Sequence, residues 1–493
     1  MLRVLLTTGG IQALALLLLF ARTKILAWFL GPEMFGAMAV IDKLVTTIAG
    51  TVALSLPLAA VRFLPPLWDG DREGFYSLLR RMASLLAMLV SLAVVVTLGV
   101  ALSRPSLFGA GLLPYRGIIV VASLTLPVVA FGPFLQSAVA AHMQPTRSML
   151  LVLAHACVVA LAALIGAPFK GLAGFYAGYA LFGSVFIVWA LRRFTREHRN
   201  SRSRRRLALR LPPGVWKFCF TMLSLAFLTP YAALYVHYKV LTTFDATTAG
   251  LMQAAIGISI AVRFILGAGH AVVVTPSIYR AHTIAARMAL ADVYQSALFV
   301  LAGVSVPLLL LFPEFAVRTL YSGSFTSGAS FVALFVAVEL LGLFNLTYST
   351  IILASDRLRF YLLQNLAAQL GMLLIAWLTI DRYGVVGAAI AAFAAQAMLL
   401  AGTLLHLRLV DGLRPRARVW ALASYLTIFL VAAGLAGVAL SGQGPLFVGA
   451  RVALYIVMVA PLLLFLTPAD RGDIGRLVGG WRGALDQDSR ASA

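Results

Sequence analysis

Six charged side chains lie deep inside long apolar stretches of this 493-residue chain. A Lys or Arg at the centre of a membrane helix costs roughly 2.5 to 3.5 kcal/mol on insertion scales, so such residues usually face a cavity and mark a ligand or ion pathway. The six residues are Arg22, Lys24, Asp42, Lys43, Arg263 and Glu339. Since cations outnumber carboxylates in this set, it predicts a binding site for an anion.

The first four charges are spaced evenly around a Gly-Pro-Glu turn that contains Pro32. Arg22 and Lys24 come eight to ten residues before Pro32, and Asp42 and Lys43 come ten to eleven residues after it. At about 1.5 Å of rise per helical residue, both pairs lie roughly 12 to 17 Å from the turn, near the middle of a membrane. The spacing therefore predicts that these side chains can meet.

Two interpretations of the charged set follow. In the favoured one, a single cavity is lined by the cations Arg22, Lys24, Lys43 and Arg263. Asp42 and Glu339 then act as charge partners or as groups that couple transport to Na⁺ or H⁺. In the other, Arg22 and Lys24 reach the outer interface and Lys43 pairs with Asp42. The cavity is favoured because outward-reaching cations oppose the usual retention of positive charge inside.

Other polar residues in apolar runs have weaker interpretations. Arg62 and Arg280 each follow a proline at the inner end of a run; we expect interface anchors, with an inner gate as the alternative. His155 and His270 are each the only histidine in their runs, so a role in proton coupling is no better supported than a structural one.

The composition identifies the elements that must position these charges. The chain is 61% hydrophobic and 11% charged, with a mean hydropathy of +0.96, which predicts an all-α polytopic membrane protein. About 20 apolar residues are needed to cross the hydrocarbon core. Fourteen runs are long enough: 5–29, 35–61, 83–102, 118–140, 149–167, 171–191, 218–236, 249–274, 294–312, 331–353, 361–380, 384–407, 419–440 and 445–466.

The distribution of Lys and Arg orients these spans. With the N-terminus inside, the inner segments hold 28 of the 39 Lys and Arg residues and the outer loops hold seven. This bias predicts cytoplasmic N- and C-termini. The formal charge of +22 lies in short loops and not on one folded face, so no nucleic-acid partner is expected. The densest basic stretch, 192–210, is a solvated linker or a site for anionic lipid head groups.

Internal similarity predicts the domain organisation. At an offset near 213, GLAGFYAGYALFG from Gly171 aligns with GVVGAAIAAFAAQ from Gly384. We expect a six-helix lobe at 1–191, a basic linker at 192–217, a second six-helix lobe at 218–408, a helix pair at 409–469 and a tail at 470–493. Two parallel lobes related by an axis along the membrane normal would permit alternating access.

Enzyme signatures are scarce. The sequence has no GxxxxGK[ST] loop and no HExxH, and its two cysteines, Cys157 and Cys219, lie inside apolar runs, so neither a cofactor nor a metal is expected. Asp69-Gly70-Asp71 matches the DxD of sugar transferases, but a solvated loop is the stronger interpretation. The chain is therefore expected to be a transporter and not an enzyme.

The segment RTKILAWFLGPEMFGAMAVIDKLVTTIAGTVALSLPLAAVRFLP, at 22–65, resembles the start of bacterial polysaccharide and O-antigen flippases. These belong to the multidrug/oligosaccharidyl-lipid/polysaccharide exporter (MOP) superfamily. LGPExxG and the VRF after the second span carry the resemblance, and the repeated G-x-x-G at spans six and twelve agrees with it.

The resemblance implies a flippase in the bacterial inner membrane. Its substrate would be an undecaprenyl-pyrophosphate-linked oligosaccharide, moved from the cytoplasmic to the periplasmic leaflet, with membrane lipids and polysaccharide polymerase machinery as partners. In the related lipid II flippases, arginines on spans one, two and eight are implicated in pyrophosphate binding. Here those spans carry Arg22 and Lys24, Lys43, and Arg263. The alternative is an ion-coupled multidrug exporter of the same superfamily.

Overall fold

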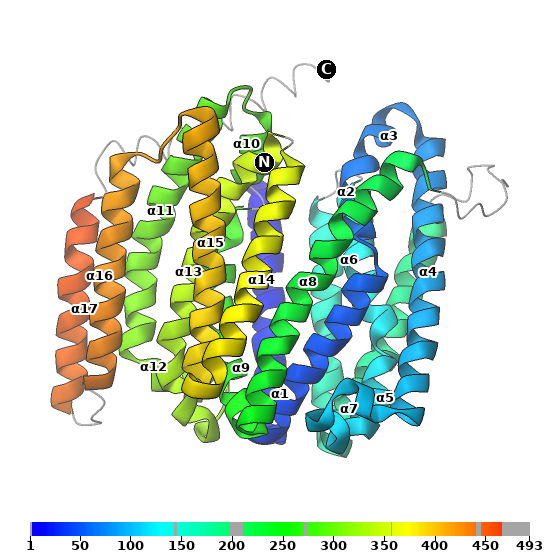
Figure 1. The fold of residues 1–493 in the computed structure, drawn as a ribbon, viewed down its shortest axis with the longest axis horizontal. Coiled ribbons are helices and arrows are strands. Elements are labelled where there is room, and N and C mark those ends of the chain that lie inside the picture. The colour runs from blue at the N-terminus through cyan, green and yellow to red at the C-terminus, as the bar shows by residue number, and fades with distance from the viewer. Residues whose placement is uncertain are drawn as a thin grey trace. The chain divides into compact units, whose positions relative to one another are not determined.

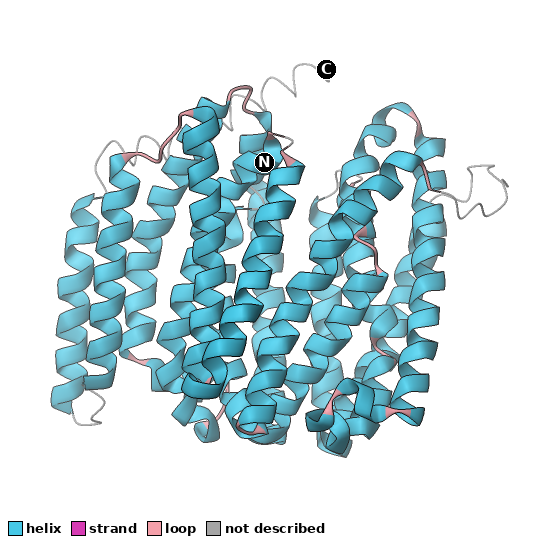
Figure 2. Cartoon of the chain, in the orientation of Figure 1, coloured by secondary structure: helices cyan, strands magenta, loops and turns pink. Residues whose placement is uncertain are grey.

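The computed structural model describes residues 2–141, 145–196, 211–270, 274–355, 357–439 and 445–465. Within these ranges the regular secondary structure is helical, without strands, and short loops join the helices (Figures 1 and 2). An unbroken helix satisfies its own backbone hydrogen bonds, which is what a chain this apolar requires in lipid.

Each predicted span corresponds to a helix, to part of one, or to two consecutive helices. The helices are α1 (Leu2–Val52), α2 (Leu56–Phe63), α3 (Pro65–Gly70), α4 (Arg72–Ser103), α5 (Arg116–Ser123), α6 (Leu126–Ala140), α7 (Pro145–Arg196), α8 (Pro213–Thr243), α9 (Ala246–Gly269), α10 (Thr275–Arg280), α11 (Ile284–Leu311), α12 (Pro313–Leu320), α13 (Ala329–Ala354), α14 (Leu358–Tyr383), α15 (Val385–Asp411), α16 (Ala417–Ala439) and α17 (Pro445–Phe465). Short 3₁₀ turns are η1 (Pro105–Phe108), η2 (Ala110–Tyr115) and η4 (Gly323–Gly328).

In the described residues, ten helices are long and apolar enough to cross a membrane. Two of them, within α1 and α7, contain a break and hold two predicted spans each. A pair bent by 47°, Ala110–Ser123 with Leu126–Ala140, matches the fourth predicted span, and the shorter apolar helix Leu446–Ala460 matches the last. The chain is therefore a multi-pass membrane protein, as the composition predicted.

Glycines with positive φ make the tight reversals. Gly31 has φ 66° inside α1, and Gly171 has φ 56° inside α7. Gly384 has φ 57° between α14 and α15. Only glycine adopts this region without steric cost. After each of the last two turns, the next glycine of G-x-x-G packs against the preceding span: Gly174 against the carbonyl of Gly166, and Gly387 against that of Thr379. The aligned sequence motifs thus form the same local structure.

By packing, the chain divides into two compact units. Unit 1 comprises Met1–Ala254, Val317–Gly328 and Asn365–Ala395; there α1 packs against α6, α7 and α8. Unit 2 comprises Ala255–Ala316, Ala329–Gln364 and Gln396–Ala493; there α11 packs against α13, α16 and α17.

A buried carboxylate fixes the start of the last helix pair in unit 2. Asp292 of α11 is 3% exposed and accepts a hydrogen bond from the Tyr348 hydroxyl at 2.7 Å. It also accepts one from the backbone N–H of Arg416, just before α16, at 3.1 Å. Burying a carboxylate is costly without such partners, so they hold α11, α13 and the start of α16 together.

The sequence-defined lobes, 1–191 and 218–408, rest on the internal repeat and remain a prediction. Part of the linker (197–210) and the whole tail (470–493) lie outside the described residues.

Candidate functional site

The first two spans form a hairpin that brings Arg22 to Asp42. In one straight helix, residues 20 positions apart would be about 30 Å apart. Here Nη2 of Arg22 lies 3.6 Å from Oδ2 of Asp42. The break at Gly31 makes this contact possible, because the two segments of α1 (Figure 1) run back past each other.

Aromatic residues of α7 complete this group. Tyr176 donates a hydrogen bond from its hydroxyl to Oδ1 of Asp42 at 2.7 Å. The guanidinium carbon of Arg22 lies 5.4 Å from the ring centroid of Phe175, a distance at which a cation and an aromatic face attract. We call Arg22, Asp42, Phe175 and Tyr176 the Arg22 cluster.

Arg22 keeps hydrogen-bonding capacity that the described residues do not use. A separation of 3.6 Å is an ion pair but too long for a good hydrogen bond. The Nε of Arg22 is buried and has no hydrogen-bond partner in the described part of the chain. Guanidinium N–H groups are donors only, so the unused ones suit the oxygens of an anion.

Arg357 in unit 2 differs from Arg22, because its guanidinium has close hydrogen-bond partners. Its Nη1 and Nη2 donate to the two carboxylate oxygens of Asp411, both at 2.7 Å. Its Nη1 also lies 2.8 Å from Nε2 of His406. These contacts tie the start of α14 to the end of α15, so Arg357 has a structural role that Arg22 does not share.

The other two cations of the first hairpin have different surroundings. Lys24 is exposed and donates from Nζ to the backbone carbonyl of Arg318, in α12, at 2.7 Å. Lys43 is half-buried and follows Asp42 directly. The structure therefore joins Arg22 to Asp42 and directs Lys24 to another partner.

Arg263 and Glu339 pair with each other in unit 2. Nη1 of Arg263 in α9 lies 3.1 Å from Oε2 of Glu339 in α13. The Arg263 side chain is 44% exposed, whereas that of Glu339 is 16% exposed. Arg263 therefore has a counter-ion and an open side.

Of the two predicted inner-end arginines, only one has a described side chain. Arg62 is in the last turn of α2, and its guanidinium carbon is 5.1 Å from the ring centroid of Phe218 in α8. This contact agrees with the expected role of Arg62 as an anchor for the end of α2. The side chain of Arg280, at the end of α10, lies outside the described residues.

Comparison with solved structures gives three informative likenesses. The lipid II flippase MurJ in an inward closed conformation has a TM-score of 0.68 at 12% identity, over 94% of this chain and 98% of MurJ. An inward-facing multidrug resistance MATE family transporter gives 0.63 at 14% identity, over 85% and 99% of the two chains. A MOP superfamily transporter from Pyrococcus furiosus, described by a binding pocket of reverse polarity, gives 0.56 at 12%, over 86% and 94%.

The chain has the fold of these solved transporters. This confirms the predicted fold class, and these structural neighbours are transporters and not enzymes. No protein-family profile matches the sequence, and no curated protein matches it. At such low identities the likeness extends to the fold alone.

Sequence reasoning missed the aromatic half of the Arg22 cluster. Tyr176 is 134 positions from Asp42, and helical periodicity does not report which spans pack together. The one available signal was the pair of aromatic residues, Phe175 and Tyr176, directly after the G-x-x-G of the sixth span.

Proposed function

We propose that this MOP-fold protein moves a polyprenyl-pyrophosphate-linked oligosaccharide across the membrane, with Arg22 as the central pyrophosphate-binding residue. The observation that supports this most is the unused Nε donor of Arg22, buried beside a single carboxylate. An arginine can bind two phosphate oxygens at once, and its donors cannot be removed by deprotonation.

The balance of charge supports an anionic substrate. In the first hairpin, the cations Arg22, Lys24 and Lys43 outnumber the carboxylates Glu33 and Asp42, so this region is net positive. Arg263 is the fourth residue that we assign to the pyrophosphate, because the resemblance to the lipid II flippases places a cation on the eighth span. Glu339 and Asp42 would hold the two arginines in place when no substrate is bound.

The substrate chemistry gives a reason for such a protein. Moving one hydroxyl group from water into hydrocarbon without a partner costs about 4 to 8 kcal/mol, so an oligosaccharide does not cross unaided at a useful rate. A hydrated, positively charged path lowers this barrier while the polyprenyl tail stays in lipid. From the resemblance to polysaccharide flippases we assign the direction as cytoplasmic to periplasmic leaflet of a bacterial inner membrane. The positive-inside bias supports cytoplasmic positions for both termini.

In this proposal the two sequence-defined lobes alternate access by rocking, as in parallel-repeat transporters. Membrane lipids are direct partners, and polysaccharide polymerase machinery is the expected consumer of the product. Asp42 and Glu339 are the groups that a coupling Na⁺ or H⁺ would use.

A second candidate is an ion-coupled multidrug exporter. The fold supports it equally, since a MATE transporter matches over 85% of this chain. Its specific support is the Asp42 side chain, which is 38% exposed and could face a cationic compound. The excess of cations around it favours the flippase.

The test is deletion of the gene in its host, followed by measurement of lipid-linked oligosaccharide in the membrane and of surface polysaccharide. The flippase predicts accumulated lipid-linked units and lost polymer, restored by the wild type but not by Arg22→Gln. Arg104→Gln, at an exposed arginine between spans, is the matched control and should restore both. Unchanged polysaccharide together with greater retention of cationic dyes would favour the exporter.

A further inference from the structure

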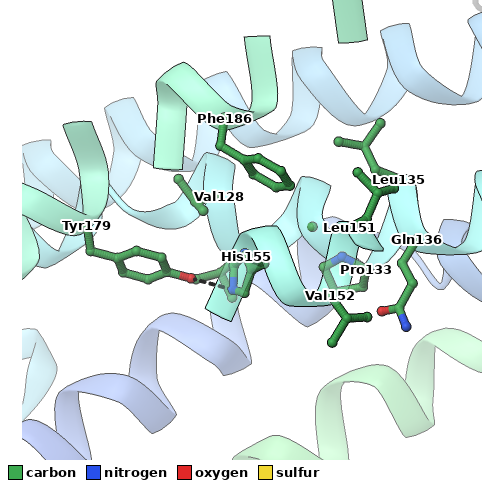
Figure 3. A pocket seen from close by; sticks show the side chains of 11 residues that line it. Val128, Pro133, Leu135, Gln136, Leu151, Val152, His155, Tyr179 and Phe186 are labelled. Atoms are coloured by element: carbon green, nitrogen blue, oxygen red, sulfur yellow. Dashed lines mark hydrogen bonds between the residues drawn. The ribbon is translucent and has the colours of Figure 1, made fainter. Parts of the chain in front are cut away.

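A second site lies in unit 1, between α6 and the two halves of α7. It is a cavity of about 260 Å³ (Figure 3). An apolar cavity of roughly 150 Å³ admits a benzene ring, so this one has room for a ring with alkyl substituents. Its lining is mainly aliphatic and aromatic, and Asp, Glu, Lys and Arg do not contribute to it.

The polar groups of the cavity are few and well defined. The hydroxyl of Tyr179 lies 3.3 Å from Nε2 of His155. The other ring nitrogen of His155, Nδ1, is buried and lacks a hydrogen-bond partner in the described part of the chain. Gln136 adds a carboxamide to the lining. A buried imidazole nitrogen without a partner costs stability, so the cavity favours an occupant that can hydrogen-bond there.

Two residues of α6 keep the space beside His155 open. A Cβ atom at Gly132 would come within 3.9 Å of Nδ1, so any larger side chain there would extend toward this nitrogen. Pro133 has no N–H, so it cannot donate to the carbonyl of Val129 four residues earlier in the helix. Val129 and Pro133 both line the cavity.

We propose that this cavity binds a small, uncharged, hydroxyl-bearing organic molecule about the size of an alkylphenol, with its hydroxyl at Nδ1 of His155. The hydroxyl suits either tautomer, because it can donate to Nδ1 or accept from it. A charged ligand would be unpaired, and a sugar would leave most of its hydroxyls without partners. A plain alkyl chain would leave Nδ1 unsatisfied.

The site is separate from the Arg22 cluster but adjacent to it. The Tyr179 ring stacks on Phe175 with 6.1 Å between centroids, and Phe175 lies beneath the Arg22 guanidinium. Figure 3 shows Phe186 above His155 and Val152 below it in this view, and both side chains line the cavity.

The test uses the full chain in nanodiscs of perdeuterated lipid, with thymol and p-cymene as probes. The two compounds share a carbon skeleton, and only thymol has a hydroxyl. Saturation-transfer NMR titration, in which magnetisation comes from protein protons, gives a dissociation constant for each. We expect thymol to bind roughly two- to tenfold more tightly than p-cymene, the value of one net hydrogen bond.

Two variants locate the binding. His155→Phe keeps a ring and removes the nitrogen, so it should abolish the preference for thymol while p-cymene still binds. Gly132→Leu should fill the cavity and weaken binding of both compounds. Leu164→Ala, on an exposed part of α7, should change neither. Equal binding of the two probes to the wild type, no binding at all, or a thymol preference that survives His155→Phe would each overturn the proposal.

Discussion

Replacing Asp42 by Asn should strengthen the binding of a pyrophosphate lipid, because it removes the counter-charge that competes for Arg22. The substitution keeps the shape of the side chain and the oxygen to which Tyr176 donates. Two unit charges 4 Å apart attract by about 4 kcal/mol at an effective dielectric constant of 20. Asp42 is 38% exposed, so we reduce this to about 1 kcal/mol for solvent screening. The expected gain in affinity is about fivefold.

Removing the charge of Arg22 should instead weaken the binding of the pyrophosphate lipid. Arg22→Gln removes the charge and should weaken binding roughly tenfold or more, since a hydrogen bond to a charged group contributes about 1.5 to 3 kcal/mol. Both variants would be titrated in nanodiscs with farnesyl pyrophosphate, with farnesol as the probe that lacks the pyrophosphate. Asp381→Asn, at another paired carboxylate of unit 1, is the control and should leave the affinity unchanged. Weaker binding by Asp42→Asn, or unchanged binding by Arg22→Gln, would refute the assignment.

Three further predictions concern the fold, and each is checked by thermal unfolding of the purified protein. Gly36→Ala places a Cβ against the backbone of α9 and should lower the free energy of unfolding by about 1 to 3 kcal/mol. Gly117→Ala is the control, because its Cβ meets open space, and it should leave the free energy of unfolding unchanged. Tyr348→Phe removes a hydrogen bond from buried Asp292 and should cost about 1.5 to 3 kcal/mol; an unchanged unfolding temperature would contradict the account of the α11–α13 contact. Gly171→Ala should cost about 1 to 2 kcal/mol because of its positive φ, and a stabilised variant would argue against the tight reversal in α7.

The elements could be predicted from the sequence because lipid restricts the choices. Apolar length identified the spans, and the Gly-Pro turn at Gly31 identified the first reversal. The repeated G-x-x-G aligned the sixth span with the twelfth, and both Gly171 and Gly384 have positive φ. In each case the requirement is local. Either the backbone hydrogen bonds must be satisfied within one span, or one residue must adopt a positive φ, and neighbouring residues in the sequence reveal both.

The site was only partly predictable because it depends on directions and distant contacts. Counting residues from the turn gave the depth of Arg22 and Asp42, and those two residues meet. Depth says nothing of direction: two positions along a helix turn by about 200°, so Arg22 and Lys24 point to different sides. Lys24 accordingly donates to Arg318, which is 294 positions away. The cavity beside His155 depends on packing between helices, which periodicity does not encode.

Reconstitution into liposomes tests the central claim most directly. Purified protein would be incorporated together with a polyprenyl-pyrophosphate-linked oligosaccharide that carries a fluorescent group, and transfer between leaflets would be followed by quenching from outside with dithionite. The account predicts protein-dependent transfer that is lost in Arg22→Gln and retained in Arg104→Gln. Transfer equal to that of protein-free liposomes, in vesicles that still export a cationic dye, would contradict it.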